Sequence, residues 1–100
     1  SAKANVTGIT FEPNPAVVGE EVNITCDEST GVPEPSYTIN HNGKQVSNNK
    51  TLVISEVKQS DEGPYTCVAQ NKLGNDSATA NLTIVGKIKF YVFSPILSLG

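Results

Sequence analysis

Apolar and polar residues alternate with a period of two in several stretches of this chain. The clearest case is where Val22, Ile24 and Cys26 alternate with Asn23 and Thr25. This period is typical of a β-strand that buries one face and exposes the other. We therefore expect a strand here, with the apolar set facing a core.

Further segments show the same alternation or a brief apolar run, and turn-forming residues separate them. We expect strands at residues 6–11, 16–18, 36–41, 52–54, 65–71 and about 77–85. The segment Glu12-Pro13-Asn14-Pro15 interrupts the first strand, because a proline cannot donate to a strand ladder. Turns at a spacing of about eight to twelve residues are typical of an antiparallel sandwich.

Turn signals of different strength separate these strands. Asn42-Gly43 is the strongest hairpin signal, because a two-residue turn of this type needs positive φ at both positions. The segment after it, residues 44–50, is short and polar. Residues 27–35 predict a loop, 58–62 a corner and 73–76 a turn.

The segment Asp61-Glu62-Gly63-Pro64-Tyr65-Thr66-Cys67 carries the most specific motif in the chain. It places a Tyr two residues before a Cys, with an Asp and a Gly upstream and the other cysteine, Cys26, about 40 positions earlier. Together with residues 18–26, 52–54 and 67–74, this motif resembles immunoglobulin domains of the I-set or C2 kind. The resemblance covers roughly residues 5–85.

The resemblance implies an all-β, two-sheet antiparallel immunoglobulin-like sandwich with Greek-key topology. It also implies a buried disulfide between Cys26 and Cys67, and a Tyr65 hydroxyl that returns to an upstream carbonyl. Residues 44–50 leave no room for the two extra strands of a variable-type domain. Ile39 occupies the position where the family usually has a Trp, so we expect it to be buried against the disulfide.

We expect one domain, residues 1–86, and a C-terminal extension, residues 87–100, that does not belong to the family pattern. The extension is apolar but too short to span a membrane. Three origins stay open with equal weight: a truncated span or anchor signal, the start of a neighbouring domain, or an alternative end of the chain. No signal peptide precedes the domain, so we expect a fragment of a longer protein.

Five Asn-x-Ser/Thr sequons occur among ten Asn residues. They begin at Asn5, Asn23, Asn49, Asn75 and Asn81. Chance would give roughly two, although the alternation of half-buried strands also produces such triplets. Sequons and paired cysteines both favour an oxidising, extracellular compartment, and we expect several of the five sites to be glycosylated.

The net charge is −3, and all seven cations are Lys. Without Arg there is no planar fork for phosphate or sulfated sugar, so nucleic acid is not an expected partner. His41 is the only imidazole and no nucleophile is placed beside it, so we expect no catalysis. Acid pairs such as Glu20-Glu21 lack the spacing of calcium ligands, and we expect no metal or cofactor.

The resemblance implies an extracellular protein-binding or spacer module of a cell-surface adhesion or recognition receptor, non-catalytic and with a membrane-anchored parent. Its partners would be proteins, through homophilic or heterophilic contact. Two rival interpretations are the ligand-binding domain of a signalling receptor such as a receptor kinase, and a structural domain of an intracellular elastic protein. Sequons and paired cysteines argue against the second rival, because neither is useful in a reducing cytosol.

The expected positions of the glycans leave one part of the surface uncovered, and this part is the candidate interface. In such a sandwich Asn23 and Thr25 face outward on the ABED sheet, Asn81 and Thr83 face outward on the CFG sheet, and Asn75 lies at the F–G turn. Glycans there would screen much of both faces, which leaves the C strand and the following hairpin bare. The candidate residues are Thr38, Asn40, Asn42 and Lys44, beside the acidic loop of Asp27, Glu28 and Glu34.

Overall fold

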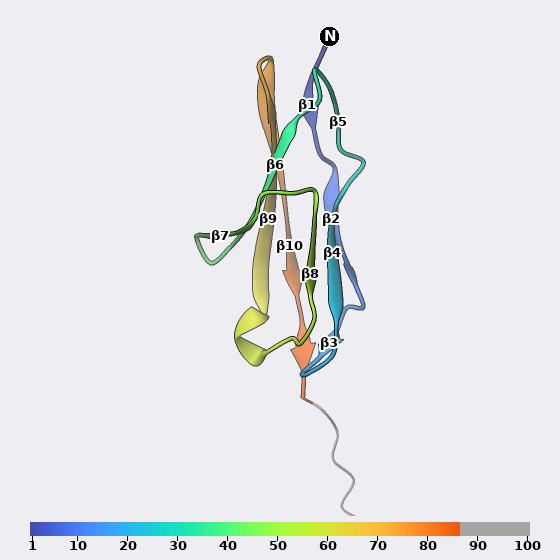
Figure 1. Ribbon diagram of the computed structural model, residues 1–100. Helices are drawn as coiled ribbons and strands as arrows, with labels where there is room; N and C mark the ends of the chain where they lie inside the picture. The colour runs from blue at the N-terminus through green and yellow to red at the C-terminus, as the bar shows by residue number, and fades with distance from the viewer. Residues whose placement is uncertain (87–100) are drawn as a thin grey trace, which may run out of the picture.

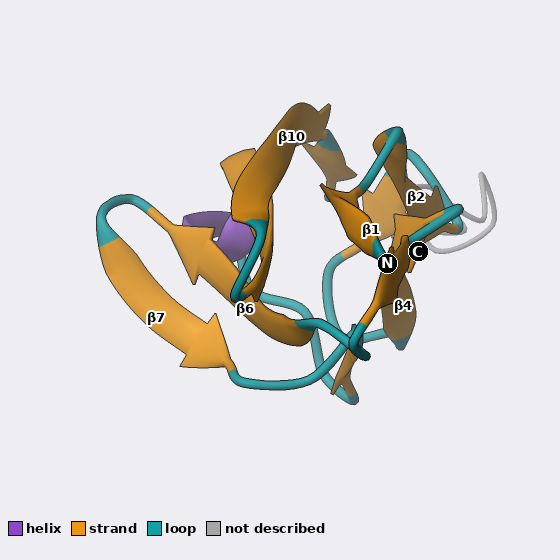
Figure 2. Cartoon of the chain, turned by 90° about the horizontal axis from the view of Figure 1, so that it is seen from above, coloured by secondary structure: helices purple, strands orange, loops and turns teal. Residues whose placement is uncertain are grey.

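The computed structural model describes residues 1–86, which form a β-sandwich with two main sheets and two short two-stranded ones; the expected extension at 87–100 lies outside the described residues (Figure 1). The larger sheet contains β6 (Ser36–His41), β7 (Lys44–Ser47), β9 (Gly63–Asn71) and β10 (Gly74–Leu82), in the order β10-β9-β6-β7. The smaller contains β2 (Gly8–Glu12), β4 (Val22–Asp27) and β8 (Thr51–Ile54), in the order β2-β4-β8. Figure 2 shows the two layers from one end. The expected all-β sandwich is confirmed.

Shorter elements complete the two layers. β1 (Ala2–Asn5) pairs with β5 (Thr30–Val32), and β3 (Ala16–Val17) runs parallel to β11 (Ile84–Val85). A 3-10 turn, η1 (Gln59–Asp61), precedes β9. The broken first strand is confirmed, because β2 pairs with β4 whereas β3, after the prolines, pairs with β11. None of the helical structure in residues 1–86 is long and apolar enough to cross a membrane.

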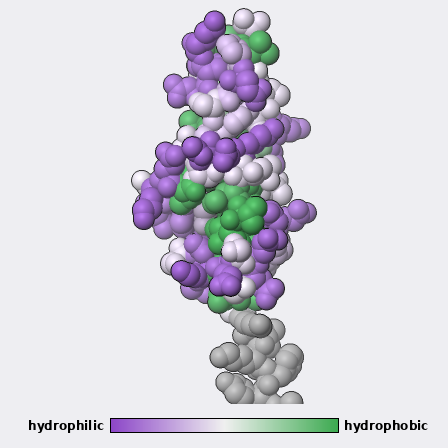
Figure 3. All heavy atoms as spheres, in the orientation of Figure 1, coloured by the Kyte–Doolittle hydropathy of each residue, from purple (hydrophilic) through white to green (hydrophobic). Residues whose placement is uncertain are grey.

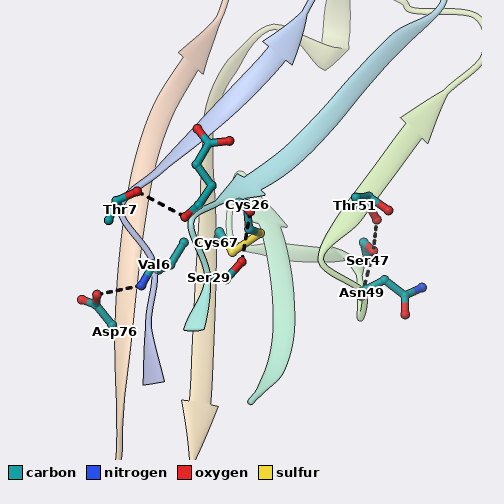
Figure 4. The surroundings of a disulfide bond; sticks show 10 residues. Val6, Thr7, Cys26, Ser29, Ser47, Asn49, Thr51, Cys67 and Asp76 are labelled. Carbon is teal, nitrogen blue, oxygen red and sulfur yellow. Dashed lines mark hydrogen bonds between the residues drawn. A yellow bond between two sulfur atoms is a disulfide. The ribbon is translucent and has the colours of Figure 1, made fainter. Parts of the chain in front are cut away.

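The core lies between the sheets and centres on a disulfide. Cys26 of β4 and Cys67 of β9 are joined by an S–S bond of 2.07 Å, with the Cα atoms 6.0 Å apart (Figure 4). Ile39 of β6 stands directly opposite Cys67 in the strand register and has 0% exposed surface. The Phe11 and Tyr65 rings meet edge to face with centroids 5.6 Å apart. The expected disulfide and the burial of Ile39 are both found.

Three local expectations were wrong. Residues 27–35 were expected to form only a loop, but 30–32 form β5 because β1 supplies a partner strand. Asn75 was expected in the F–G turn, but β10 begins at Gly74, so Asn75 lies within that strand. The D strand of the implied ABED sheet does not form within residues 1–86, which leaves β8 as the sheet edge.

Candidate protein-binding surface

The strand pair β6–β9 has two faces of opposite character. His41 stands opposite Tyr65 in the register, and Asn40 stands opposite Thr66. His41 and Tyr65 are buried, whereas Asn40 and Thr66 are partly exposed. Because neighbouring strand residues point to opposite faces, the first pair belongs to the core and the second to the outer surface.

On the inner face, Tyr65 fixes the corner that precedes β9. Its hydroxyl donates to the Asp61 carbonyl at 2.7 Å, as the resemblance implied. Burial, and second the charge of Asp61, raise the pKa of Tyr65 from 10.0 to about 12. The Asp61 carboxylate accepts from the Lys58 backbone N–H at 2.7 Å, and Gly63 supplies a φ of 120° that suits glycine. These contacts make Asp61 a structural acid.

His41 completes the same inner cluster. Its ring stacks on Tyr65 with centroids 4.1 Å apart and planes 7° apart. Its Nδ1 lies 2.9 Å from the Pro64 carbonyl and its Nε2 lies 3.3 Å from the Ser60 carbonyl. The imidazole is therefore engaged in holding the corner. No group of His, Cys, Asp and Glu in the described residues has a geometry that could hold a metal ion.

The outer face carries a shallow hollow beside the β6–β7 turn. Its volume is about 400 Å³, and its lining residues are Asn40, Asn42, Gly43, Pro64 and Thr66. The turn itself has φ of 51° at Asn42 and 75° at Gly43, which confirms the predicted hairpin. The hollow offers side-chain amides, a hydroxyl and an apolar proline ring to a ligand.

The structure brings three of the four candidate interface residues to this face. Asn40 and Asn42 line the hollow, and Thr38, half-buried, is two residues from Asn40 on the same side of β6. Lys44 stands opposite His41 in the register, so it belongs to the other side of the sheet. The position beside Asn40 is taken by Gln45.

The sequence interpretation missed Gln45, Pro64 and Thr66. Gln45 was within reach, because counting across a two-residue turn pairs residue 41 with 44 and residue 40 with 45. Pro64 and Thr66 had no such signal, since they come beside Asn40 only through the long-range β6–β9 register. The acidic loop is tied to the first strands: the Thr10 hydroxyl donates to Asp27 at 2.6 Å and the Thr7 hydroxyl to Glu28 at 3.1 Å.

All sequon asparagines lie on the surface. They are Asn5, Asn23, Asn49, Asn75 and Asn81, and each is exposed. Within residues 1–86 none of their side-chain amides has a hydrogen-bond partner. By contrast, Asn71 donates to the Ala2 carbonyl at 2.8 Å and accepts from the Ala4 N–H at 3.2 Å. None of the five side-chain amides therefore holds residues 1–86 together through a hydrogen bond.

Comparisons with known proteins agree with this architecture. The family model described as immunoglobulin domain matches residues 8–71. Neural cell adhesion molecule 1 of Homo sapiens is 30% identical over 100 residues, covering 88% of this chain and 11% of that protein. Inactive tyrosine-protein kinase 7 of Homo sapiens is 33% identical over 81 residues, covering 74% and 8% respectively.

Among solved structures, an amphioxus IgVJ-C2 molecule superposes with a TM-score of 0.70 at 26% identity, covering 80% of this chain and 43% of that one. The chain spans about a tenth of the length of the two curated relatives. Each likeness therefore concerns one module of a longer protein.

Proposed function

The chain belongs to the immunoglobulin domain family, and on that premise we propose that it is an extracellular, non-catalytic protein-binding module of a cell-surface adhesion or recognition receptor. The observation that carries the proposal is the outer face of β6–β9, where Asn40 and Asn42 line a hollow and the Asn40 amide has no hydrogen-bond partner within residues 1–86, while the Asn42 amide nitrogen lies 3.3 Å from His41 Nε2. The similarity to neural cell adhesion molecule 1 supports an adhesion receptor as the parent. The parent holds the module outside the cell on a membrane anchor.

The chemistry of this face suits a protein partner. The Asn40 amide offers two donors and an acceptor, and the Asn42 amide keeps its oxygen and one N–H beside its contact with His41; these groups match the backbone groups of a polypeptide. Pro64 adds apolar surface between them. A specific contact of standard size covers about 800 Å² per partner, so this hollow forms only the centre of an interface. Tandem modules or many copies on a surface then supply the remaining affinity.

The sequons restrict the direction from which a partner approaches. Asn81 of β10 stands directly opposite Pro64, which lines the hollow. A glycan on Asn81 covers the β10 side of this face. The partner therefore approaches from the β6–β7 side, where Gln45 stands next to Asn40.

The interface is tested on cells that display the chain on a membrane anchor, scored for aggregation among themselves and for binding to unmodified cells. Asn40→Arg places a long cation in the hollow and should abolish contact. Glu12→Arg is the control, because Glu12 is exposed on the outer face of the other sheet, makes no side-chain hydrogen bond within residues 1–86 and belongs to no sequon. Loss of contact with Glu12→Arg and none with Asn40→Arg would move the interface to that sheet, and no loss with either variant would mean that the module is a spacer.

The compartment is tested separately. The chain is expressed with a secretion signal, and its mass is compared before and after enzymatic removal of N-glycans. Several of the five exposed sequons should be occupied. A secreted chain without glycans and with two free thiols would contradict the extracellular assignment and favour the intracellular structural role.

A ligand-binding module of a signalling receptor is the second candidate function. The similarity to inactive tyrosine-protein kinase 7 at 33% identity favours it. The same outer face would then bind a ligand, and Asn40→Arg would lower binding to unmodified cells without changing aggregation of the displaying cells. Loss of aggregation instead favours the adhesion role.

A further inference from the structure

β8 is the outer strand of the smaller sheet, and its open edge is apolar. The order β2-β4-β8 leaves one side of β8 without a partner strand within residues 1–86. Val53 is 54% exposed, and Leu52 and Ile54 beside it are only partly buried. In Figure 3 a hydrophobic patch occupies the middle of the visible face, where Figure 1 draws β8. An uncovered edge of this kind favours pairing with another strand.

The backbone of Val53 points toward this open edge. The Cys26 N–H donates to the Lys50 carbonyl at 2.9 Å, so Lys50 faces β4. In an antiparallel ladder, successive residues direct their backbone groups to opposite sides. Thr51 and Val53, at odd distances from Lys50, therefore face the open edge. The β4 ladder does not use the Val53 N–H or carbonyl.

The upper end of the edge is partly closed by the preceding loop. The Ser47 hydroxyl donates to the Thr51 carbonyl at 3.1 Å, and the Asn49 N–H donates to the Ser47 hydroxyl at 3.0 Å (Figure 4). The Thr51 carbonyl keeps a second lone pair. Within residues 1–86, Val53 is the β8 residue with both backbone groups free, so a pairing would centre on it.

The sequence around Val53 is complementary to itself in an antiparallel arrangement. If Val53 stands opposite the same residue of a second copy, Lys50 stands opposite Glu56. In the same register Leu52 stands opposite Ile54. Both charged residues are exposed and lie just outside β8, Lys50 before it and Glu56 in the bend after it, so opposite charges flank each end of the paired strands. The register also makes the two Val53 residues a hydrogen-bonded pair, because their N–H and carbonyl groups both face the edge.

We propose that β8 pairs antiparallel with β8 of a second copy of this chain, about a two-fold axis at Val53. The three-stranded sheets of the two copies then join into one continuous sheet. The contact is isologous, so each copy supplies the same residues. An edge this short buries less than the roughly 1,200 Å² of a stable interface, so pairing is weak in solution and gains strength when many copies share a surface. This contact is separate from the hollow on the outer face of β6–β9, and the proposal does not depend on that hollow.

The test measures association of the full chain, with its disulfide formed and without glycans, by sedimentation equilibrium from about 10 μM to about 1 mM. Val53→Pro removes the N–H that the pairing needs and no ladder bond to β4, so the domain should fold normally and associate at least about tenfold more weakly. Association unchanged by Val53→Pro would overturn the proposal. So would a chain that stays monomeric throughout the range.

Charge reversal supplies a second and independent variant set. Lys50→Glu places two like charges opposite each other at each end, and Glu56→Lys does the same; each should weaken association by about tenfold. The double variant restores opposite charges and should recover association to within about threefold. Lys72→Glu makes the same charge change in the β9–β10 turn, far from β8, and should have no effect. A double variant as weak as the single ones would contradict the register.

The rate of hydrogen exchange at the Val53 amide shows whether a second copy or a segment of the same chain covers the edge of β8. Pairing with a second copy protects this amide only at high concentration. Protection at every concentration, including dilute solution, would mean that a segment of the same chain, such as residues 87–100, covers the edge, and it would overturn the proposal.

Discussion

The two faces of the β6–β9 pair are built from alternate residues of the same strands, yet they differ in every respect. On the inner face, His41 and Tyr65 are buried and bonded to carbonyls of the corner. On the outer face, Asn40 and Thr66 line an open hollow. The comparison shows that the inner polar groups are held by carbonyls of the corner, whereas on the outer face Thr66 contacts only the exposed Thr79 hydroxyl at 2.9 Å and Asn40 has no side-chain hydrogen bond within residues 1–86. Changes on the inner face should therefore cost stability, and changes on the outer face should cost only recognition.

The largest expected effect is on the inner face at the disulfide. Cys67→Ala removes a bond that closes a separation of 41 residues, and the free energy of unfolding should fall by about 2–5 kcal/mol. Denaturant unfolding followed by circular dichroism measures it. Cys26→Ala combined with Cys67→Ala controls for the thiol left by the single change. A loss below about 1 kcal/mol would show that the sandwich does not depend on this bond.

Tyr65→Phe should have the next largest effect. It removes the hydrogen bond to the Asp61 carbonyl and leaves that carbonyl unpaired, which should cost about 1–2 kcal/mol of unfolding free energy. Thr66→Ala is the comparison on the outer face; it removes an exposed contact with the Thr79 hydroxyl at 2.9 Å that water can replace, so it should change stability by no more than about 0.5 kcal/mol. Equal losses in the two variants would remove the distinction between the faces.

The free energy of unfolding at alkaline pH should depend on the same residue, Tyr65. Burial raises the pKa of Tyr65 from 10.0 to about 12. The neutral form is therefore favoured by folding, and its stabilisation is complete below pH 10.0 and is lost as pH rises toward about 12. Unfolding free energies measured across this window should decline more steeply for the unmodified chain than for Tyr65→Phe. Parallel declines would contradict the assignment.

A pair of single-methyl deletions sharpens the comparison further. Ile39→Val removes one methyl group from the fully buried side chain opposite Cys67 and should cost about 1 kcal/mol. Thr38→Ser removes one methyl group from the outward neighbour and should cost less than about 0.5 kcal/mol. Thermal and denaturant unfolding measure both. A larger loss for Thr38→Ser would mean that β6 is displaced by one residue.

Features fixed by nearby residues were predictable from the sequence. The positive φ of Asn42 and Gly43, the bounds of β6 and the Tyr65 bond to Asp61 all follow from residues within a few positions of one another. Ile39 also followed, because its place was counted from the hairpin. In these cases local turn chemistry and the period of two agree with the overall fold.

Features set by the pairing of distant segments were not predictable to the same degree. The β5 strand exists because β1 lies beside it, and the hollow exists because the β6–β9 register brings Pro64 and Thr66 next to Asn40. Lys44 was grouped with the candidate interface because it is close to Asn42 in the sequence. Its register partner is His41, and this pairing puts Lys44 on the other side of the sheet. One sequence does not encode a register between strands explicitly, and a shift of one residue changes every face.

The smallest expected effect is local and concerns how the first strands attach to β10. The Asp76 carboxylate accepts from the Val6 N–H at 3.0 Å (Figure 4). It also accepts from the Ser77 N–H at 3.0 Å. The Val6 bond is the main cause that lowers the pKa of Asp76 below its ordinary 3.8. The Ser77 bond and the charge of Lys3 also lower this pKa, whereas partial desolvation raises it. The extra stability that the charged carboxylate gives this attachment is thus present above pH 3.8 and is lost as pH falls through the lowered pKa.

This attachment is followed through the chemical shift of the Val6 amide proton in an acid titration. In the unmodified chain the shift should change as the Asp76 carboxyl is protonated. Asp76→Asn keeps an acceptor oxygen but has no charge, so the amide should stay bonded and the titration should disappear. Asp76→Ala removes the acceptor, so the amide should show the unbonded shift at every pH. A Val6 shift that titrates identically in all three proteins would assign the effect to another carboxylate and would separate Asp76 from the attachment of the first strands.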